Sequence, residues 1–190
     1  MPRIRADGLA AGQCSSPGPA GRDPNVQGGA VILGVGAYGV APKPNGRLRT
    51  LALGSCVALI LHHRERALAG MAHIALPDSA INPARAVELP GYFADTGIEV
   101  LLRAMSKFAD ALPSGLTACL IGGANVLRAG ALFNIGEKNV AALRKELVKR
   151  GFTTVVEDVG GTISRSVEVD SATGRVLVTS PGRESWEVRP

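Results

Sequence analysis

The sequence predicts an α+β fold, in which helices pack on a mostly antiparallel or mixed sheet. Three observations carry this prediction. About seven short apolar runs have the length of buried strands, whereas two segments show the apolar spacing of helices. Strands dominate both ends of the chain, as in α+β proteins. Hydrophobic residues make up 46% of the 190 residues and charged residues 19%, so the chain can form a packed core and is not globally disordered.

The N-terminal segment differs in composition from the rest. Residues 13–29 (QCSSPGPAGRDPNVQGG) are rich in Gly, Pro and Ser and can bury little apolar surface. We therefore expect a flexible tail over residues 1–28 and a single domain over residues 29–190. Val31–Val35 is expected to form a first short strand, and Lys43–Gly46 (KPNG) a turn.

The middle of the chain begins with two strands that are separated by a pair of small residues. Leu48–Leu53 and Cys56–Leu61 are short apolar runs, and Gly54-Ser55 interrupts them. After a polar break, Ala67–Ala75 resumes a strand-like run. Leu76–Pro90 contains three prolines and is predicted to be a long loop.

Two helices are expected. Tyr92–Ala111 shows helical spacing of its apolar residues and ends before Pro113. Lys138–Arg150 is the second, with basic residues toward its C-terminus and Gly151 as a stop signal. Leu116–Ile121, between them, has the pattern of a buried strand.

The C-terminal region is predicted to be all strand. Phe152–Glu157, Ile163–Val169 and Arg175–Thr179 have strand-like patterns. The segment Asp170–Gly174 (DSATG) is rich in turn residues, so the last two strands are expected to form a hairpin.

Charge and composition argue against nucleic-acid or membrane binding. Residues 1–49 hold six Lys or Arg and two Asp (+4), which leaves fifteen basic and fourteen acidic residues (+1) for the rest of the chain. A nearly neutral body with seven aromatic residues offers no basic stripe and few stacking platforms. No run approaches the roughly 18 apolar residues of a membrane span. The start of the chain lacks the apolar stretch of a secretory signal.

The three cysteines, Cys14, Cys56 and Cys119, are odd in number and lack paired spacing. This argues against a disulfide framework or a zinc site and favours a reducing, cytoplasmic setting. The glycine pairs at 122–123 and 160–161 lack the spacing of a phosphate-binding loop and are interpreted as turns or packing points. We therefore expect neither a metal nor another cofactor.

Cys56 is the candidate nucleophile. Cys119 lies within an apolar strand and is expected to be an inert buried thiol. Cys56 instead opens a strand directly after Gly54-Ser55, where small residues let a substrate approach. The backbone N–H groups of Ser55 and Cys56 there are candidates for stabilising an oxyanion. A cysteine at a strand start is also, and more often, a small core residue.

A thiol nucleophile needs a base. His62 lies on the same apparent strand, about 20 Å from Cys56, and His63 is no better placed. A hairpin centred near Arg64-Glu65 would set His73 directly opposite Cys56, with Cα atoms about 4.5–5.5 Å apart. For the group that orients the imidazole, Thr50, Asp78 and Asn82 are rivals, and spacing alone does not choose among them.

Read together, several blocks resemble the CheD family of chemoreceptor glutamine deamidases of bacterial and archaeal chemotaxis. The resemblance spans roughly residues 31–180. The blocks are LGSCVALIL (53–61), GMAHIALP (70–77), IGGANVL (121–127), IGEKNV (135–140), EDVGGTISR (157–165) and TGRVLV (173–178).

This resemblance implies a catalytic cysteine, histidine and threonine, which map onto Cys56, His73 and Thr50. It also implies a layered α/β/β fold like that of the deamidating cytotoxic necrotizing factor toxins. The implied activity is that of a cytoplasmic hydrolase. It would convert specific glutamines on the cytoplasmic helices of chemoreceptors to glutamate through a thioester.

Two other functions remain open. Some members of the family bind a CheC-type phosphatase, so the chain could be a non-catalytic module that regulates such a partner. The order of cysteine before histidine also permits a cysteine peptidase or general amidase, although no other peptidase signature is present.

Overall fold

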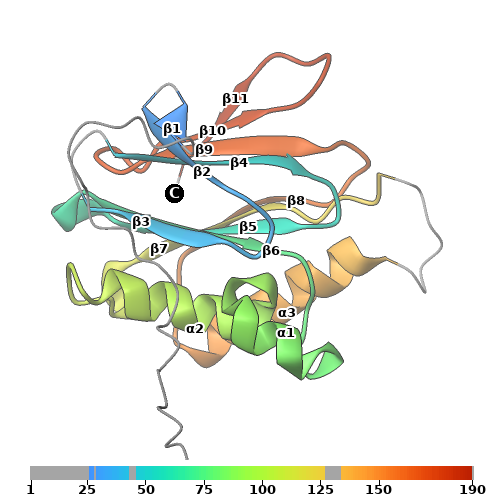
Figure 1. Cartoon of the computed structure of the whole chain (residues 1–190). Helices are drawn as coiled ribbons and strands as arrows, with labels where there is room; N and C mark the ends of the chain where they lie inside the picture. The colour runs from blue at the N-terminus through green and yellow to red at the C-terminus, as the bar shows by residue number, and fades with distance from the viewer. Residues whose placement is uncertain (1–25, 28, 43–45, 127–133, 190) are drawn as a thin grey trace, which may run out of the picture.

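The chain forms three layers in this computed structural model, which describes residues 26–27, 29–42, 46–126 and 134–189 (Figure 1). The outer sheet has the strand order β1 (Val26–Gln27), β2 (Ala30–Leu33), β4 (Arg47–Leu53), β9 (Arg165–Asp170), β10 (Val176–Thr179) and β11 (Trp186–Val188). The central sheet has the order β3 (Tyr38–Ala41), β6 (Leu68–Ile74), β5 (Val57–His63), β7 (Thr117–Gly122) and β8 (Val155–Val159).

Helices form the third layer, on the face of the central sheet that points away from the outer sheet (Figure 1). They are α1 (Pro83–Glu88), α2 (Ala94–Met105) and α3 (Ile135–Lys149). Both sheets are mixed, because β2 pairs parallel with β4 and β7 pairs parallel with β8, while the other described pairs are antiparallel. The predicted α+β class and the layered α/β/β sandwich are confirmed.

The central sheet is covered on both faces, which explains why β5 and β6 are buried along their whole length. Side chains at alternate positions of these strands face the helices, including Val57, Leu59 and Ile74. The side chains at the positions between them face the outer sheet, including Ala58, Ile60 and Met71. A strand that is buried on both faces is apolar throughout, instead of alternating apolar and polar residues. The sequence of β5 is apolar in this way until its last two residues, which are histidines.

Helix α2 turns an apolar stripe toward the central sheet. Ile98, Leu101 and Met105 are fully buried, one turn apart. The helix ends at Met105, six residues before the predicted end. There the Ser106 hydroxyl donates to the Arg103 carbonyl (2.9 Å), a local bond that competes with helical continuation.

Helix α3 begins three residues earlier than predicted. Asn134 caps it by accepting from the Glu137 N–H (3.3 Å), and the Glu137 carboxylate accepts in turn from the Asn134 side chain (3.0 Å). The first bond satisfies one free N–H group at the start of the helix, and the second holds the capping side chain in place.

The predicted loop over 76–90 is wrong in part, because α1 lies within it. Pro83 occupies the first helical turn, where a missing N–H costs nothing, and Asn82 caps the helix by accepting from the Arg85 N–H (3.0 Å). Strands β3 and β11 were not predicted from the sequence. Of the predicted tail over 1–28, Val26–Gln27 pair with β2, whereas Cys14 lies outside the described residues.

The β5–β6 hairpin has a register two residues away from the predicted one. His63 pairs with Leu68, and Ala58 pairs with His73. The connection consists of a 3₁₀ turn (Arg64–Arg66) followed by Ala67, whose φ of 47° lies in the left-handed region. This longer loop moves the centre of the hairpin along by one residue.

Replacing Ala67 by glycine should raise the free energy of unfolding by about 1 kcal/mol, because a left-handed conformation costs a residue with a Cβ about that much and glycine almost nothing. Urea unfolding measures the change. The matched control is Ala141→Gly, at an exposed position within α3, which should lower the same quantity by about 1 kcal/mol. A loss of stability in Ala67→Gly would contradict the strain at residue 67.

Candidate active site

A β-bulge in β4 sets the direction of Thr50. Thr50 pairs with Val167 and Leu53 pairs with Arg165, so Leu51 and Ala52 together stand opposite one residue of β9. Ala52 has a φ of 55°, and its N–H donates to the Ser166 hydroxyl (3.1 Å). Because of the extra residue, the side chains of both Thr50 and Leu53 are buried between the sheets.

Thr50 and His73 make a hydrogen bond that crosses from the outer sheet to the central sheet. Thr50 Oγ1 lies 2.7 Å from His73 Nδ1, and the Thr50 hydroxyl donates to the Leu33 carbonyl (2.8 Å). A hydroxyl has one hydrogen. Since the Leu33 carbonyl takes it, the hydrogen of the second bond belongs to His73 Nδ1, and the lone pair of the neutral ring then resides on Nε2. Nε2 is buried and has no partner among the described residues.

Cys56 lies on the same side of the central sheet as His73. The last pair of the β5–β6 ladder is Val57 with Ile74, so continuation of the ladder puts Cys56 opposite Ala75 and diagonal to His73. Cys56 packs against the apolar cluster between the two sheets, and Thr50 reaches His73 from that side. The predicted direct opposition is therefore wrong, because the hairpin is longer. Diagonal partners remain about 7–8 Å apart at Cα, within reach of longer side chains.

Burial moves the pKa values of both groups toward the neutral forms. Desolvation lowers the pKa of His73 to about 4, although the nearby Leu33 carbonyl opposes this, and it raises the pKa of the Cys56 thiol. His73 is 3% exposed, and Cys56 is partly exposed. At neutral pH the free protein therefore holds an uncharged imidazole with an available lone pair beside an un-ionised thiol.

The backbone around Cys56 is held through its carbonyl groups. The Gly54 carbonyl accepts from the Ala124 N–H, and the Cys56 carbonyl from the Gly123 N–H, both at 2.8 Å. Gly122, at φ +117°, lets the chain come this close, since a Cβ there would lie 2.4 Å from the Cys56 oxygen. Among the described residues, the N–H groups of Ser55 and Cys56 have no acceptor, as the oxyanion role predicted for them requires.

Sequence reasoning missed Asn139. Its side chain is fully buried on α3 and donates to the carbonyls of Ser55 and Ala75. One feature of the sequence could have indicated it. Asn139 stands next to Val140, on the apolar face of the predicted helix, where a buried polar side chain needs a hydrogen-bond partner.

The other candidates have different positions. His62 Nε2 lies 3.0 Å from the Ser171 carbonyl at the far end of β5. Asp78 accepts from the Ala80 N–H, and Asn82 caps α1, so neither orients His73. Cys119 is fully buried, and burial raises the pKa of its thiol to about 12, as expected for an inert thiol.

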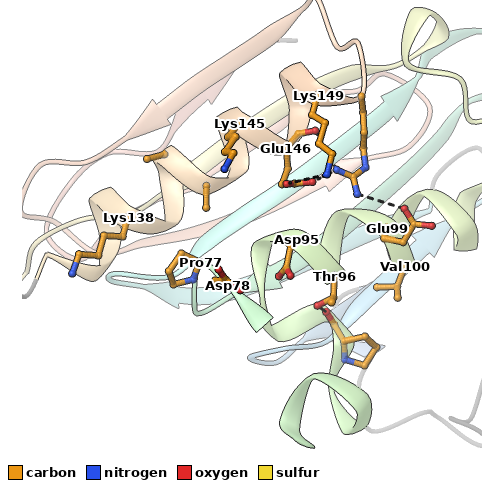
Figure 2. Close-up of a pocket in the computed structure, with 14 residues that line it drawn as sticks. Pro77, Asp78, Asp95, Thr96, Glu99, Val100, Lys138, Lys145, Glu146 and Lys149 are labelled. Atoms are coloured by element: carbon orange, nitrogen blue, oxygen red, sulfur yellow. Dashed lines mark hydrogen bonds and ion pairs between the residues drawn. The ribbon is translucent and has the colours of Figure 1, made fainter. Parts of the chain in front are cut away.

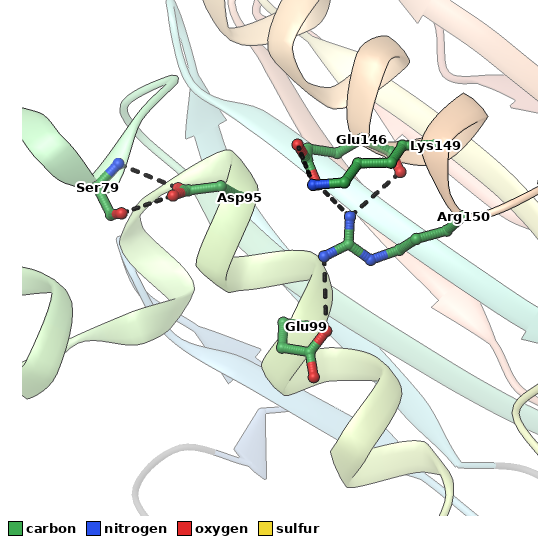
Figure 3. A network of polar contacts seen from close by, with 6 residues as sticks. All are labelled: Ser79, Asp95, Glu99, Glu146, Lys149 and Arg150. Atoms are coloured by element: carbon green, nitrogen blue, oxygen red, sulfur yellow. Dashed lines mark hydrogen bonds and ion pairs between the residues drawn. The ribbon is translucent and has the colours of Figure 1, made fainter.

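A wide groove that the described residues form lies elsewhere. It has a volume of about 800 Å³, runs between α2 and α3, and is lined by neither Cys56 nor His73 (Figure 2). Along it, Arg150 pairs with Glu146 on its own helix and with Glu99 on α2 (3.5 Å for the latter; Figure 3). The ion pair of Arg150 with Glu99 joins the two helices along this groove, and of the candidate residues above only Asp78 lines it.

Two further observations concern the described residues as a set. They contain no group of three His, Cys, Asp or Glu side chains placed to hold a metal ion. They also contain no helix that is both long and apolar enough to cross a membrane.

The chain is similar to known proteins over most of its length. Residues 75–180 match the family model CheD, described as chemotactic sensory transduction. A protein of Syntrophotalea carbinolica named "Probable chemoreceptor glutamine deamidase CheD" is 43% identical over 83% of this chain and 98% of its own length. The Thermotoga maritima protein named "Chemoreceptor glutamine deamidase CheD" is 37% identical over 80% of this chain and 92% of its own. A solved structure, the Bacillus licheniformis hypothetical protein YfiH, reaches a TM-score of 0.44 at 13% identity, covering 66% of this chain and 51% of its own.

Replacing His73 by asparagine should change how stability depends on pH. The unfolded chain takes up a proton on this residue near pH 6.5, whereas the folded one does so near pH 4. As the pH falls through this interval the unfolded state binds more protons, so the wild type loses up to about 3 kcal/mol from this group. Urea unfolding at several pH values between about 7 and about 4 should show a shallower decline for His73→Asn. Parallel declines would mean that His73 titrates normally in the folded protein.

Proposed function

The chain belongs to the CheD family, and from that premise we propose that it deamidates specific glutamine side chains of chemoreceptors, with Cys56 as the nucleophile, His73 as the base and Thr50 as the group that orients His73. The product is a glutamate on a cytoplasmic helix of the receptor. The exchange adds a negative charge and alters repulsion between helices, which would tune signalling. The proposed setting is the cytoplasm.

The Thr50–His73 contact is the observation that carries this proposal. A buried histidine whose Nδ1–H is held by a hydroxyl has its Nε2 lone pair fixed in one direction. Cys56 lies on the same face of the sheet, one diagonal position away, and is the nucleophilic side chain from which this lone pair can take a proton. No hydrogen bond joins the two side chains in the described structure, but such contacts often shorten only when substrate binds.

The proposed reaction starts from the neutral pair. His73 Nε2 takes the proton from Cys56 Sγ as the sulfur attacks the carboxamide carbon of the glutamine, and the carbonyl oxygen becomes an oxyanion. The N–H groups of Ser55 and Cys56 stabilise this oxyanion. The imidazolium then gives its proton to the nitrogen, the C–N bond breaks, and ammonia leaves a thioester.

Water completes the reaction. His73 Nε2 takes a proton from the water as its oxygen attacks the thioester carbon, and a second oxyanion forms in the same place. Collapse of this intermediate breaks the C–S bond, and Cys56 recovers its proton from the imidazolium. The net change is one water consumed and one ammonia released per glutamine.

A neutral resting pair fits a general-base mechanism better than a stored ion pair. Burial opposes ionisation of both groups in the free protein. Ionising Cys56 only while it attacks avoids the cost of holding two charges in an apolar site. The low pKa of His73 also keeps its lone pair available throughout the neutral range.

The non-catalytic alternative, a module that regulates a CheC-type phosphatase, stays a prediction, and so does a peptidase activity. Docking alone does not require a buried threonine to fix one nitrogen of a histidine. The same assay separates the three functions. Conversion of glutamine supports the deamidase, and cleavage of the peptide chain supports a peptidase. If neither reaction occurs, the non-catalytic docking module is supported.

Changing the nucleophile should remove the activity without unfolding the protein. Cys56→Ser and Cys56→Ala should both abolish conversion of glutamine to glutamate in a chemoreceptor fragment, followed by mass spectrometry, because neither side chain supplies a thiolate. Cys119→Ser is the matched control and should keep most activity, since Cys119 lies in the core away from the site. Loss of activity in Cys119→Ser with retention in Cys56→Ser would reverse the assignment.

Thr50→Val keeps the shape of the side chain but removes the oxygen that holds His73 Nδ1–H. Turnover should fall about 10- to 100-fold, corresponding to a lost buried hydrogen bond of about 1–3 kcal/mol, while KM stays close to that of the wild type. Steady-state kinetics on the receptor fragment measures both quantities. An unchanged turnover number would remove Thr50 from the proposed machinery.

A further inference from the structure

Asn139 holds the peptide unit that precedes Cys56. Its side chain is fully buried on α3, and its Nδ2 lies 2.9 Å from the Ser55 carbonyl oxygen and 2.9 Å from the Ala75 carbonyl oxygen. One amide nitrogen carries two hydrogens, so both bonds can form at once. The contact joins α3 to the backbone directly before the proposed nucleophile.

The geometry of the peptide bond turns this contact into a constraint on Cys56. The Ser55 carbonyl and the Cys56 N–H belong to one planar trans peptide unit, in which C=O and N–H point in opposite directions. Because Asn139 draws the Ser55 oxygen inward toward α3, the Cys56 N–H must point outward, away from the helix. That N–H has no acceptor among the described residues.

The flanking peptide units are held in the same way, but by backbone groups. The Gly54 carbonyl accepts from the Ala124 N–H, which turns the Ser55 N–H outward, and the Cys56 carbonyl accepts from the Gly123 N–H. Of these three carbonyls, only that of Ser55 is held by a side chain. A substitution can therefore release that peptide unit while the other two anchors remain.

The second bond of Asn139 ties the nucleophile to the strand of the base. Ala75 follows β6 two residues after His73, and the β5–β6 ladder ends at the pair of Val57 and Ile74. Ser55 and Ala75 thus lie just beyond the last ladder pair. Asn139 continues the connection between the two strands where their own hydrogen bonds stop.

We propose that Asn139 is a positioning residue, which aims the Cys56 N–H at the oxygen of the substrate amide and keeps β5 and β6 in register at the site. This inference rests on the proposed function and adds a residue to it. Asn139 does not touch the substrate. It acts on the two tetrahedral intermediates by fixing the direction of a donor before the charge on the oxygen develops.

The experiment compares turnover with thiol reactivity in Asn139→Leu, which offers no donor. Glutamine conversion forms an oxyanion, whereas alkylation of Cys56 by iodoacetamide displaces iodide and forms none. A misdirected N–H should therefore lower kcat about 100-fold, in the range seen when one oxyanion donor is lost. KM and the rate of Cys56 alkylation, followed by peptide mass spectrometry, should each stay within about threefold of the wild type.

A second variant and a control keep the test decisive. Asn139→Asp has nearly the same volume, and its carboxyl group, which burial keeps protonated, can donate one hydrogen bond. Its kcat should lie between those of the wild type and Asn139→Leu. If Asn139→Leu does not fold, Asn139→Asp alone carries the same comparison. Leu147→Ala, two turns along the same helix and fully buried, destabilises α3 without touching Ser55 and should keep kcat near that of the wild type.

Three results would overturn the role of Asn139. They are a kcat within about threefold of the wild type in Asn139→Leu, alkylation that falls in parallel with kcat, and an equal loss of kcat in Leu147→Ala. The failure of the proposed function itself looks different. In that case the wild type leaves every glutamine of the receptor fragment unchanged, or converts it equally well after Cys56→Ala.

Discussion

One hydrogen bond between the two sheets, from His73 to Thr50, is the interaction on which the proposed chemistry depends. It brings together a strand of the outer sheet and a strand of the central sheet at a point that is buried from both sides. The bond fixes the position of the imidazole and also its tautomer, since the hydrogen of Thr50 is already committed to the Leu33 carbonyl. Without the second sheet, His73 would be a core histidine whose ring nitrogens have no assigned roles.

Backbone irregularities around this bond make the site possible. The bulge at Leu51 and Ala52 lets Thr50 and Leu53 face the same side, and it places a left-handed alanine two residues before the glycine–serine–cysteine turn. Bulges of this kind re-aim side chains next to functional sites. Beyond the bulge, carbonyl groups are anchored inward and N–H groups are left outward, an arrangement that a regular strand pair would not leave open. Both features interrupt regular strand pairing and leave the N–H groups of Ser55 and Cys56 available for the proposed oxyanion.

The site achieves this with almost no fixed charge. The proposed base, His73, is neutral, the proposed nucleophile, Cys56, is an un-ionised thiol, and the proposed oxyanion donors are peptide groups. In an apolar layer between two sheets, uncharged groups avoid the desolvation cost that a resting ion pair would carry. The same burial lowers the pKa of His73, so protonation of this group favours the unfolded chain. Among the described residues, the salt bridge of Arg150 with Glu99 joins α2 and α3 away from these groups.

The amino-acid sequence alone determined the fold class, the strands that form the middle of both sheets, and the set of residues from which the site is drawn. Apolar periodicity and the motifs around Cys56 and His73 are local properties, so they can be read along the chain. Residue spacing did not separate Thr50 from Asp78 and Asn82, although the resemblance to the CheD family pointed to Thr50. Spacing also misplaced the hairpin register by two residues and gave no reason to single out Asn139. Tertiary structure decided these points, because each depends on which groups meet across layers. A threonine on one sheet reaches a histidine on another, and a helix amide holds a turn 84 residues away in the chain. Contacts of that kind arise only when loop lengths and packing are fixed together, and local patterns do not record them.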